Sequence, residues 1–336
     1  PVDGGQPIML AEALDRNMSK PSFSYDGKLI YFIMEESGTN ILASIEPMGK
    51  NFRRVIRGEI SISDYDIKGD EIFPLMGKAN QPYEVFRFSN TLKELTSLND
   101  GVLGNLKKPI IEKIQFKSAD GTAIEGFVVK PIGFEASKKY PTILWIHGGP
   151  VSQHQFEYDM EPQLYAANGY VTLLINPRGS SGYGQAFSEA LFADWGNKDY
   201  QDVMAGVDYA IGQGYADPDK LGVGGWSYGG ILTNYVITKT NRFKGAISGA
   251  SEALYRSNYG HDHYQLTWEL ELGLPWENAE AWEKISPFNQ VANITTPTLW
   301  IGGEKDWNVP ILNSEQMYQA MKRLDRETQL VVYPDE

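Results

Sequence analysis

The 336-residue sequence contains no cysteine, which excludes disulfide bonds, a thiolate nucleophile and zinc or iron–sulfur sites with cysteine ligands. Histidine is scarce, with four residues, and the 30 Lys and Arg are outnumbered by 43 Asp and Glu, a net charge of −13. A chain this acidic is a poor match for nucleic acid or for an anionic membrane surface, because both attract basic proteins. We therefore expect neither of them as a partner.

Long apolar runs are also absent. No stretch approaches the roughly 18 apolar residues of a membrane-spanning helix, and the opening Pro1–Gly5 lacks the basic and apolar regions of a signal peptide. Because a leader can be removed, localisation stays open, and we expect a soluble protein of the bacterial periplasm or cytoplasm. With 42% hydrophobic residues the chain can build packed cores, and its length predicts two domains.

Residues 1–107 carry short apolar and aromatic runs separated by Gly, Asn and Asp, a pattern typical of β-strands. Leu29–Ile33 and Glu71–Leu75 each follow a turn with a glycine, and these glycines, Gly27 and Gly69, are 42 residues apart. A four-stranded unit that repeats at about 40–45 residues is typical of β-propeller blades. Since a closed propeller needs about four to eight blades, two repeats cannot close a ring, and we expect residues 1–107 to form only part of a propeller. A small all-β sandwich is the alternative.

In residues 108–336 the sequence pattern changes, and predicted strands alternate with predicted helices. A hairpin around Asp120 and Gly121 comes first. Six strands of the buried type follow: Thr142–Ile146, Tyr170–Ile175, Leu221–Gly224, Gly245–Ser248, Thr298–Ile301 and Gln329–Val332. Helical patterns of apolar residues separate them. This alternation predicts an α/β domain with a mostly parallel sheet that helices cover on both faces.

The sharpest motif is Gly225-Trp226-Ser227-Tyr228-Gly229, which lies directly after a predicted strand and before a predicted helix. A nucleophile elbow has this placement, with small residues two positions before and after the serine so that the strand and helix backbones can approach. Ser227 is therefore the candidate nucleophile, and Trp226 and Tyr228 should shape the pocket on the acyl side. A glycine-rich turn with an incidental serine is the alternative.

Two further loops supply partners for such a serine. His147-Gly148-Gly149-Pro150 ends the strand Thr142–Ile146, and the N–H groups of Gly149 and Tyr228 are the candidate oxyanion donors. After the strand Thr298–Ile301, Asp306 is the best candidate for an acid that orients an imidazolium, with Glu304 as its competitor.

The base of such a triad is missing from its expected place. The four histidines, His147, His154, His261 and His263, all precede Asp306, whereas in this kind of fold the histidine follows the acid. It should lie in the loop after the last strand, and the sequence reaches only the beginning of that loop.

Two other features have weaker functional interpretations. Arg178 lies in a glycine-rich loop after the strand Tyr170–Ile175 and could bind a substrate carboxylate, with a structural ion pair as the alternative. His261 and His263 lack a third ligand in the sequence around them, so no metal site is expected.

Together these motifs resemble the catalytic domain of the prolyl oligopeptidase family of serine peptidases, and the resemblance covers residues 110–336. The matching segments are His147–Pro150, Asn176–Ser180, Gly182–Gly184, Gly225–Gly230, Glu271–Glu277 and Asp306 with Val309 and Pro310. The acylaminoacyl-peptidase and dipeptidyl-peptidase-like bacterial branch is the most similar. The resemblance implies an α/β-hydrolase domain preceded by a β-propeller that caps it, and a catalytic histidine just beyond Glu336.

The sequence therefore predicts a serine peptidase that hydrolyses short peptides through an acyl-enzyme on Ser227 and needs no cofactor or metal. A carboxylesterase on the same scaffold shares every residue named above. An inactive fragment is the other alternative, and we expect residues 1–336 alone to be nearly inactive for want of the histidine. Residue specificity is open, and a homo-oligomer is compatible with the sequence.

Overall fold

The computed structural model describes residues 4–336, so the first three residues of the predicted blade region lie outside the described residues. It contains two compact units. Unit 1 runs to Lys108 and includes two later segments, Gln155–Glu161 and Ser181–Ala186. Unit 2 consists of Pro109–His154, Pro162–Ser180 and Phe187–Glu336.

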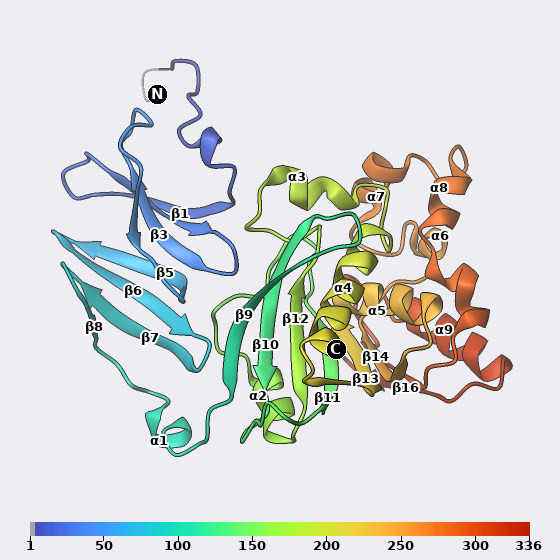
Figure 1. Cartoon of the computed structure of the whole chain (residues 1–336). Coiled ribbons are helices and arrows are strands. Elements are labelled where there is room, and N and C mark those ends of the chain that lie inside the picture. Colours follow the sequence, from blue (N-terminus) through green and yellow to red (C-terminus); the bar gives the residue numbers. More distant parts are fainter. Residues whose placement is uncertain (1–3) are drawn as a thin grey trace. The chain divides into compact units, whose positions relative to one another are not determined.

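The strands of unit 1 form two four-stranded antiparallel meanders, drawn from blue to cyan in Figure 1. The strands are β1 (Met18–Phe23), β2 (Ile30–Glu35), β3 (Asn40–Ile45) and β4 (Arg53–Ile56) in the first meander, and β5 (Ser61–Lys68), β6 (Glu71–Lys78), β7 (Gln81–Phe88) and β8 (Leu92–Glu94) in the second. A parallel contact between β3 and β5 joins the meanders. Two short helices flank them, η1 (Glu12–Leu14) and α1 (Asp100–Leu103).

The two meanders repeat each other in the way the sequence predicts. Gly27 and Gly69, which precede β2 and β6, both have the positive φ that favours glycine, +67° and +62°. One apolar core takes Ile33 and Leu42 from the first meander and Ile72 and Phe86 from the second. This repeat confirms the expectation of propeller blades and disagrees with two facing sheets of a sandwich.

The two later segments of unit 1 are bound to its strands by hydrogen bonds. The Phe156 N–H donates to the carbonyl of Gly38 (2.9 Å), and the Ser37 N–H donates to the carbonyl of Gly182 (3.0 Å). The Tyr83 hydroxyl donates to Glu157 Oε2 (2.9 Å). Such contacts between distant parts of the chain leave no local signal in the sequence.

The sheet of unit 2 has eight strands in the order β16-β15-β14-β13-β11-β12-β10-β9. Its strands are β9 (Ile110–Lys117), β10 (Ala123–Lys130), β11 (Tyr140–Ile146), β12 (Val171–Asn176), β13 (Ala216–Trp226), β14 (Phe243–Gly249), β15 (Thr298–Gly303) and β16 (Thr328–Tyr333). The strands from β11 to β16 pair in parallel, and β9 and β10 form the antiparallel hairpin. The predicted α/β organisation is therefore confirmed.

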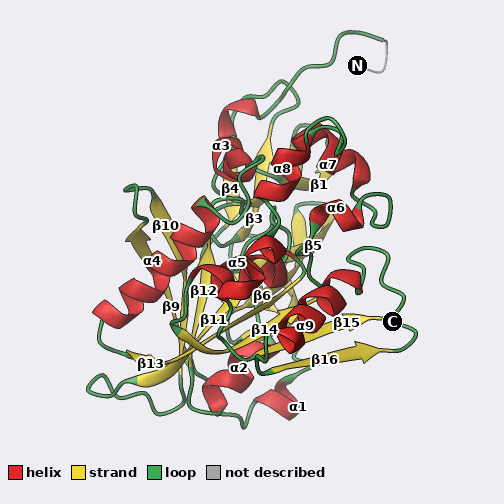
Figure 2. Ribbon diagram, turned by 90° about the vertical axis from the view of Figure 1, so that its right-hand side faces the viewer, coloured by secondary structure: helices red, strands yellow, loops and turns green. Residues whose placement is uncertain are grey.

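Helices α4 (Lys198–Gly212), α5 (Tyr228–Lys239) and α9 (Leu312–Arg323) pack against this sheet and lie across it in Figure 2. The other helices are α2 (Met160–Ala167), α3 (Gln185–Ser188), η2 (Glu189–Leu191), α6 (Tyr255–Asn258), α7 (Gln265–Leu272), α8 (Ala279–Lys284) and η3 (Pro287–Asn293). Within residues 4–336, none of the helices combines the length and the apolar character needed to cross a membrane.

Candidate active site

Ser227 forms the one-residue turn between β13 and α5. Its backbone has φ +57° and ψ −124°, which a residue with a Cβ rarely adopts and which costs about 1–3 kcal/mol. Two hydrogen bonds hold the turn: the Ser227 N–H donates to the carbonyl of Gly249 (3.0 Å), and the Ser227 carbonyl accepts from the N–H of Ile231 (2.9 Å). A sharp, strained turn from strand to helix is the geometry expected of a nucleophile elbow.

The glycines around Ser227 are required by close backbone approach. A Cβ on Gly225 would lie 2.5 Å from the carbonyl oxygen of Ile146 at the end of β11, and a Cβ on Gly229 would lie 2.1 Å from the same oxygen. Contacts this short are not tolerated, and a backbone carbonyl cannot move aside as a flexible side chain can. The glycines therefore let the elbow lie directly against β11.

The two predicted oxyanion donors line the same cavity as Ser227. Tyr228 is the first residue of α5, so its N–H has no acceptor within the helix. Gly149 has φ +126°, and its N–H makes no hydrogen bond within residues 4–336. Two available N–H groups beside a serine hydroxyl can bind the oxyanion of a tetrahedral intermediate.

The cavity beside Ser227 has a volume of about 300 Å³ and belongs to unit 2. Five aromatic side chains and three glutamates line it, and none of the described lining residues is basic. The lining residues are Gly149, Pro150, Val151, Ser188, Glu189, Leu191, Phe192, Trp195, Ser227, Tyr228, Ile231, Glu252, Tyr264, Thr267, Trp268, Glu271 and Val309. The structure thus brings three of the predicted site residues together, whereas Trp226, Arg178 and Asp306 do not line this cavity.

Asp306 lies in the loop after β15, three residues before the lining residue Val309. Its Oδ1 accepts hydrogen bonds from the N–H groups of Asn308 (2.8 Å) and Val309 (2.9 Å). Among the described residues its Oδ2 has no partner. The loop therefore fixes the carboxylate by one oxygen and leaves the other for a group such as an imidazole. Glu304, the predicted competitor, has an exposed side chain.

The histidines of the chain are engaged elsewhere or exposed. Both ring nitrogens of His147 make hydrogen bonds, Nδ1 with the carbonyl of Gly148 (2.6 Å) and Nε2 with the hydroxyl of Ser180 (3.0 Å). Burial lowers the pKa of His147 to about 4, so its ring is neutral at pH 7. The Nε2 of His154 lies 3.1 Å from the carbonyl of Trp145. His261 and His263 are exposed.

Behind the nucleophile, the Tyr228 side chain is anchored by a buried acid. The Tyr228 hydroxyl donates to Asp199 Oδ2 (3.0 Å), which also accepts from the N–H of Gly196 (3.2 Å), while Asp199 Oδ1 accepts from the N–H of Tyr200 (2.8 Å). Burial raises the pKa of Asp199 from 3.8 to about 6 despite these hydrogen bonds. The position of the residue after Ser227 is thus linked to an acid that titrates near neutral pH.

We expect Asp199→Asn to change how stability depends on pH. Well below pH 3.8, Asp199 is protonated in the folded and the unfolded protein; as pH rises to about 6, the unfolded chain loses this proton first, so the folded state loses stability. From pH 4 to pH 7 the free energy of unfolding of the wild type should fall relative to Asp199→Asn by about 2–3 kcal/mol. Urea unfolding at both pH values measures this, with the exposed Asp219→Asn as control. Parallel pH curves for the wild type and Asp199→Asn would contradict it.

Arg178 is committed to an ion-pair network. Its Nε and Nη2 donate to the two carboxylate oxygens of buried Asp202 on α4 (2.9 and 2.7 Å), and its Nη1 pairs with Asp120 in the β9–β10 turn. The side chain is only 7% exposed. A guanidinium with both edges occupied by the protein's own carboxylates is not free to bind a substrate carboxylate, so the structure favours the alternative of a structural ion pair over the predicted substrate-binding role.

Arg178→Met should therefore act on stability. It leaves the Asp202 carboxylate buried without its partner, and we expect a loss of about 3–5 kcal/mol in the free energy of unfolding. Asp202→Leu in the same chain should restore part of it, because both charges are then removed. Denaturant unfolding combined with peptidase kinetics checks this. An unchanged stability with a raised KM would instead support substrate binding by Arg178.

Trp226 ends β13; the residue is 50% exposed, and its ring lies against Gly249. Its predicted role in binding substrate stays a prediction. Most of the cavity lining has no signal in the sequence, and the polar or aromatic residues Trp195, Glu252 and Glu271 are the main examples. Glu271 lies within a segment that was singled out only for its resemblance to the family, and no motif marked Glu252 or Trp195.

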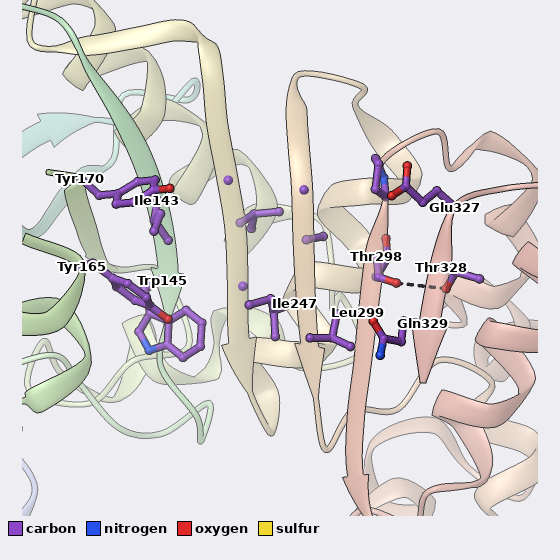
Figure 3. A pocket seen from close by; sticks show the side chains of 16 residues that line it. Ile143, Trp145, Tyr165, Tyr170, Ile247, Thr298, Leu299, Glu327, Thr328 and Gln329 are labelled. Atoms are coloured by element: carbon purple, nitrogen blue, oxygen red, sulfur yellow. Dashed lines mark hydrogen bonds between the residues drawn. The ribbon is translucent and has the colours of Figure 1, made fainter. Parts of the chain in front are cut away.

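A second groove, of about 570 Å³, lies on the sheet of unit 2 and shares no lining residue with the cavity beside Ser227. Figure 3 shows its wall of Trp145 and Ile143 on β11, Ile247 on β14 and Leu299 on β15. Its lining is mainly apolar and includes no serine, histidine or basic side chain among the described residues. Its hydroxyl-bearing threonines, Thr298 and Thr328, lie within β15 and β16 and hydrogen-bond to that sheet, whereas Ser227 lies at a strand-to-helix turn. We therefore place the candidate site at Ser227.

Comparison with known proteins agrees with the family that the sequence motifs resemble. The Prolyl oligopeptidase family matches residues 156–336. The chain is 35% identical to the "Uncharacterized peptidase YuxL" of Bacillus subtilis, over 99% of this chain and 54% of that protein. It is 30% identical to the "Dipeptidyl-peptidase 5" of Porphyromonas endodontalis, over 91% of this chain and 46% of that protein. The chain thus spans about half the length of the curated relatives it matches.

Solved structures are similar over nearly the whole chain. An acylaminoacyl peptidase of Pyrococcus horikoshii superposes with a TM-score of 0.87 at 28% identity and covers 96% of this chain and 52% of its own. An acylaminoacyl peptidase in complex with Z-Gly-Gly-Phe-chloromethyl ketone superposes with a TM-score of 0.89 at 27% identity, with the same coverage. The chain therefore has the fold of an α/β-hydrolase domain preceded by part of a β-propeller.

Proposed function

Because the chain belongs to the prolyl oligopeptidase family, we propose that it is part of a serine peptidase that hydrolyses short peptides through an acyl-enzyme on Ser227. The observation that supports this best is the strained turn at Ser227, with the N–H groups of Tyr228 and Gly149 on the same cavity. The names of the relatives, peptidases of the acylaminoacyl and dipeptidyl type, support a peptide substrate.

In the proposed reaction the Ser227 Oγ attacks the scissile carbonyl carbon while a base takes the hydroxyl proton. The negative charge moves to the carbonyl oxygen, which the N–H groups of Tyr228 and Gly149 stabilise. The C–N bond then breaks as the base returns the proton to the departing amine, and the acyl group stays esterified to Ser227. Water, activated by the same base, attacks this ester and releases the new carboxylic acid together with the free serine.

We propose that the base is a histidine beyond Glu336, oriented by Asp306. The last residues run beside the Asp306 loop: the Glu304 N–H donates to the carbonyl of Tyr333 (2.9 Å), and the Lys305 N–H donates to the carbonyl of Glu336 (2.7 Å). A residue that follows Glu336 would therefore emerge next to this loop. In that arrangement residues 1–336 by themselves would lack the base.

The proposal extends to the domains. Residues 1–107 would be the last blades of a propeller, and residues 108–336 the catalytic domain without its final histidine-bearing segment. The family resemblance implies that the complete propeller caps the catalytic domain, which would restrict substrates to short peptides. A net charge of −13 suits a soluble protein, and a bacterial periplasmic or cytoplasmic location stays a prediction.

The proposed function is tested by substrate hydrolysis with a longer protein, which continues beyond Glu336 and includes the proposed histidine. We expect it to release p-nitroaniline from aminoacyl-p-nitroanilides, because acyl transfer from an amide is the proposed reaction, and to hydrolyse p-nitrophenyl esters as well. Turnover of the esters without the anilides would indicate a carboxylesterase. Turnover of neither would contradict an acyl-transfer enzyme.

A further inference from the structure

Glu252, in the loop after β14, is a buried acid that the proposed mechanism does not use. It lines the cavity beside Ser227 and is 1% exposed. Neither oxygen of its carboxyl group makes a hydrogen bond of good geometry among the described residues, although the side chains of Asn258 and Asp262 lie beside the group. Burying a carboxyl group without partners is costly. An unpartnered carboxyl on the wall of a cavity is therefore suited to a group that a ligand brings.

The backbone that carries Glu252 is held from two sides. The Asn234 Nδ2 of α5 donates to the Glu252 carbonyl (3.0 Å). The Asn313 Oδ1 of α9 accepts from the N–H groups of Ala253 and Leu254, both at 2.6 Å. These hydrogen bonds fix the loop, so the Glu252 side chain has a defined place on the wall of the cavity.

Aromatic rings form a second part of that wall. Trp195 and Trp268 pack edge to face with ring centroids 5.2 Å apart, and Trp195 packs in the same way on Tyr228 (5.5 Å). The Trp195 ring is itself fixed, because its Nε1 donates to Glu271 Oε1 (2.6 Å). Aromatic faces accept both an aliphatic stem and a cationic head.

The charges of the lining favour a cation over an anion. Three of its residues are glutamates and, among the described lining residues, none is Lys, Arg or His. Burial, with a further contribution from the neighbouring Asp262 carboxylate, raises the pKa of Glu252 well above its usual range. An incoming cation would stabilise the ionised form and so lower this pKa.

From this geometry we infer that the cavity binds a basic side chain, that of an arginine or lysine whose carbonyl group Ser227 attacks, and that Glu252 binds its charged head. The inference rests on the proposed function and names its substrate class. The aliphatic stem would lie along Trp195 and Trp268 with the head at Glu252. A neutral aromatic residue, such as the phenylalanine of the inhibitor bound to the similar acylaminoacyl peptidase, would fill the space and leave both oxygens of Glu252 unpaired.

Cleavage of matched peptide substrates by the longer protein tests this inference. The substrates carry Arg, Lys, norleucine, Gln or Phe before the scissile bond and a blocked N-terminus. We expect kcat/KM for Arg and Lys to exceed that for norleucine by about 10–100-fold. Glu252→Gln should lower kcat/KM for Arg and Lys by about 10–100-fold and leave the norleucine value within about threefold, because it keeps the shape and removes the charge.

The control is Glu269→Gln, on α7 but outside the cavity lining, which should retain the wild-type preference. A preference for Phe or norleucine in the wild type, or an equal effect of Glu252→Gln on all substrates, would overturn the inference. So would a preference for Gln as strong as that for Lys, because the carboxyl group would then act as a neutral hydrogen-bonding group.

A binding measurement separates this inference from the proposed function. Isothermal titration calorimetry with n-butylguanidine, and with 1-pentanol as the neutral comparison, requires no turnover. We expect n-butylguanidine to bind the wild type and to bind Glu252→Gln about 10-fold or more weakly. Binding of the cation without any peptidase activity would overturn the proposed function alone, whereas peptidase activity without cation binding would overturn the assignment of Glu252.

Discussion

Replacing Ser227 by alanine should lower kcat for peptide hydrolysis by about 10⁴–10⁶-fold. The reason is that the acyl-enzyme cannot form without the Ser227 Oγ, while the oxyanion N–H groups and the cavity can still bind the substrate. KM should accordingly change little, and the protein should remain folded, because the side chain of Ser227 makes no hydrogen bond within residues 4–336. Steady-state kinetics of the longer protein, together with its unfolding curve, measures both quantities.

The matched control for this variant is Ser188→Ala. Ser188 lines the same cavity, and its hydroxyl donates to the carbonyl of Ser180 (2.9 Å). If activity depends on Ser227 alone, Ser188→Ala should retain kcat within about tenfold of the wild type. Comparable losses in both variants would indicate damage to the cavity, and a Ser227→Ala protein of normal activity would remove Ser227 from the mechanism.

Asp306→Asn should lower kcat on the order of 10⁴-fold. The asparagine can keep the Asp306 position, because its Oδ1 still accepts from the N–H groups of Asn308 and Val309. In place of Oδ2, however, it presents an NH₂ group that donates, so a histidine beside it is held in the wrong tautomer and its imidazolium loses a negative partner. The loss should therefore appear in kcat, with stability nearly unchanged.

The neighbouring Glu304→Gln separates the two acids of this loop. The Glu304 side chain is exposed, while its backbone N–H pairs with the carbonyl of Tyr333 whichever side chain is present. We expect Glu304→Gln to retain kcat within about tenfold of the wild type. A large loss in Glu304→Gln with a small one in Asp306→Asn would assign the acid to Glu304.

The elbow could be predicted from the sequence because its causes are local. Gly225 and Gly229 flank Ser227 at fixed offsets, and the reason for them, an approach to Ile146, follows from any strand-to-helix turn packed against a parallel neighbour. The α/β order and the repeat of 42 residues between Gly27 and Gly69 are likewise patterns along the chain. The observed strands lie close to the ranges predicted from the sequence for the same reason, although β13 begins at Ala216, five residues before the predicted start at Leu221.

Contacts between distant residues could not be predicted in this way. Arg178 meets Asp202 and Asp120, which lie 24 and 58 residues away along the chain, so the sequence left open whether it pairs within the protein or binds substrate. Glu252 lies in no motif, and only the folded cavity shows that its carboxyl group is buried without a partner. In both cases the role depends on which elements meet, and local spacing carries no record of that.

The most direct test of the central claim, that Ser227 is the nucleophile, is reaction of the longer protein with a fluorophosphonate, followed by intact-mass measurement and sequencing of the labelled peptide. We predict a single adduct on Ser227, complete loss of peptidase activity as the adduct forms, and no adduct in Ser227→Ala. An adduct on another residue, or full peptidase activity in a protein that does not react, would contradict the proposed mechanism.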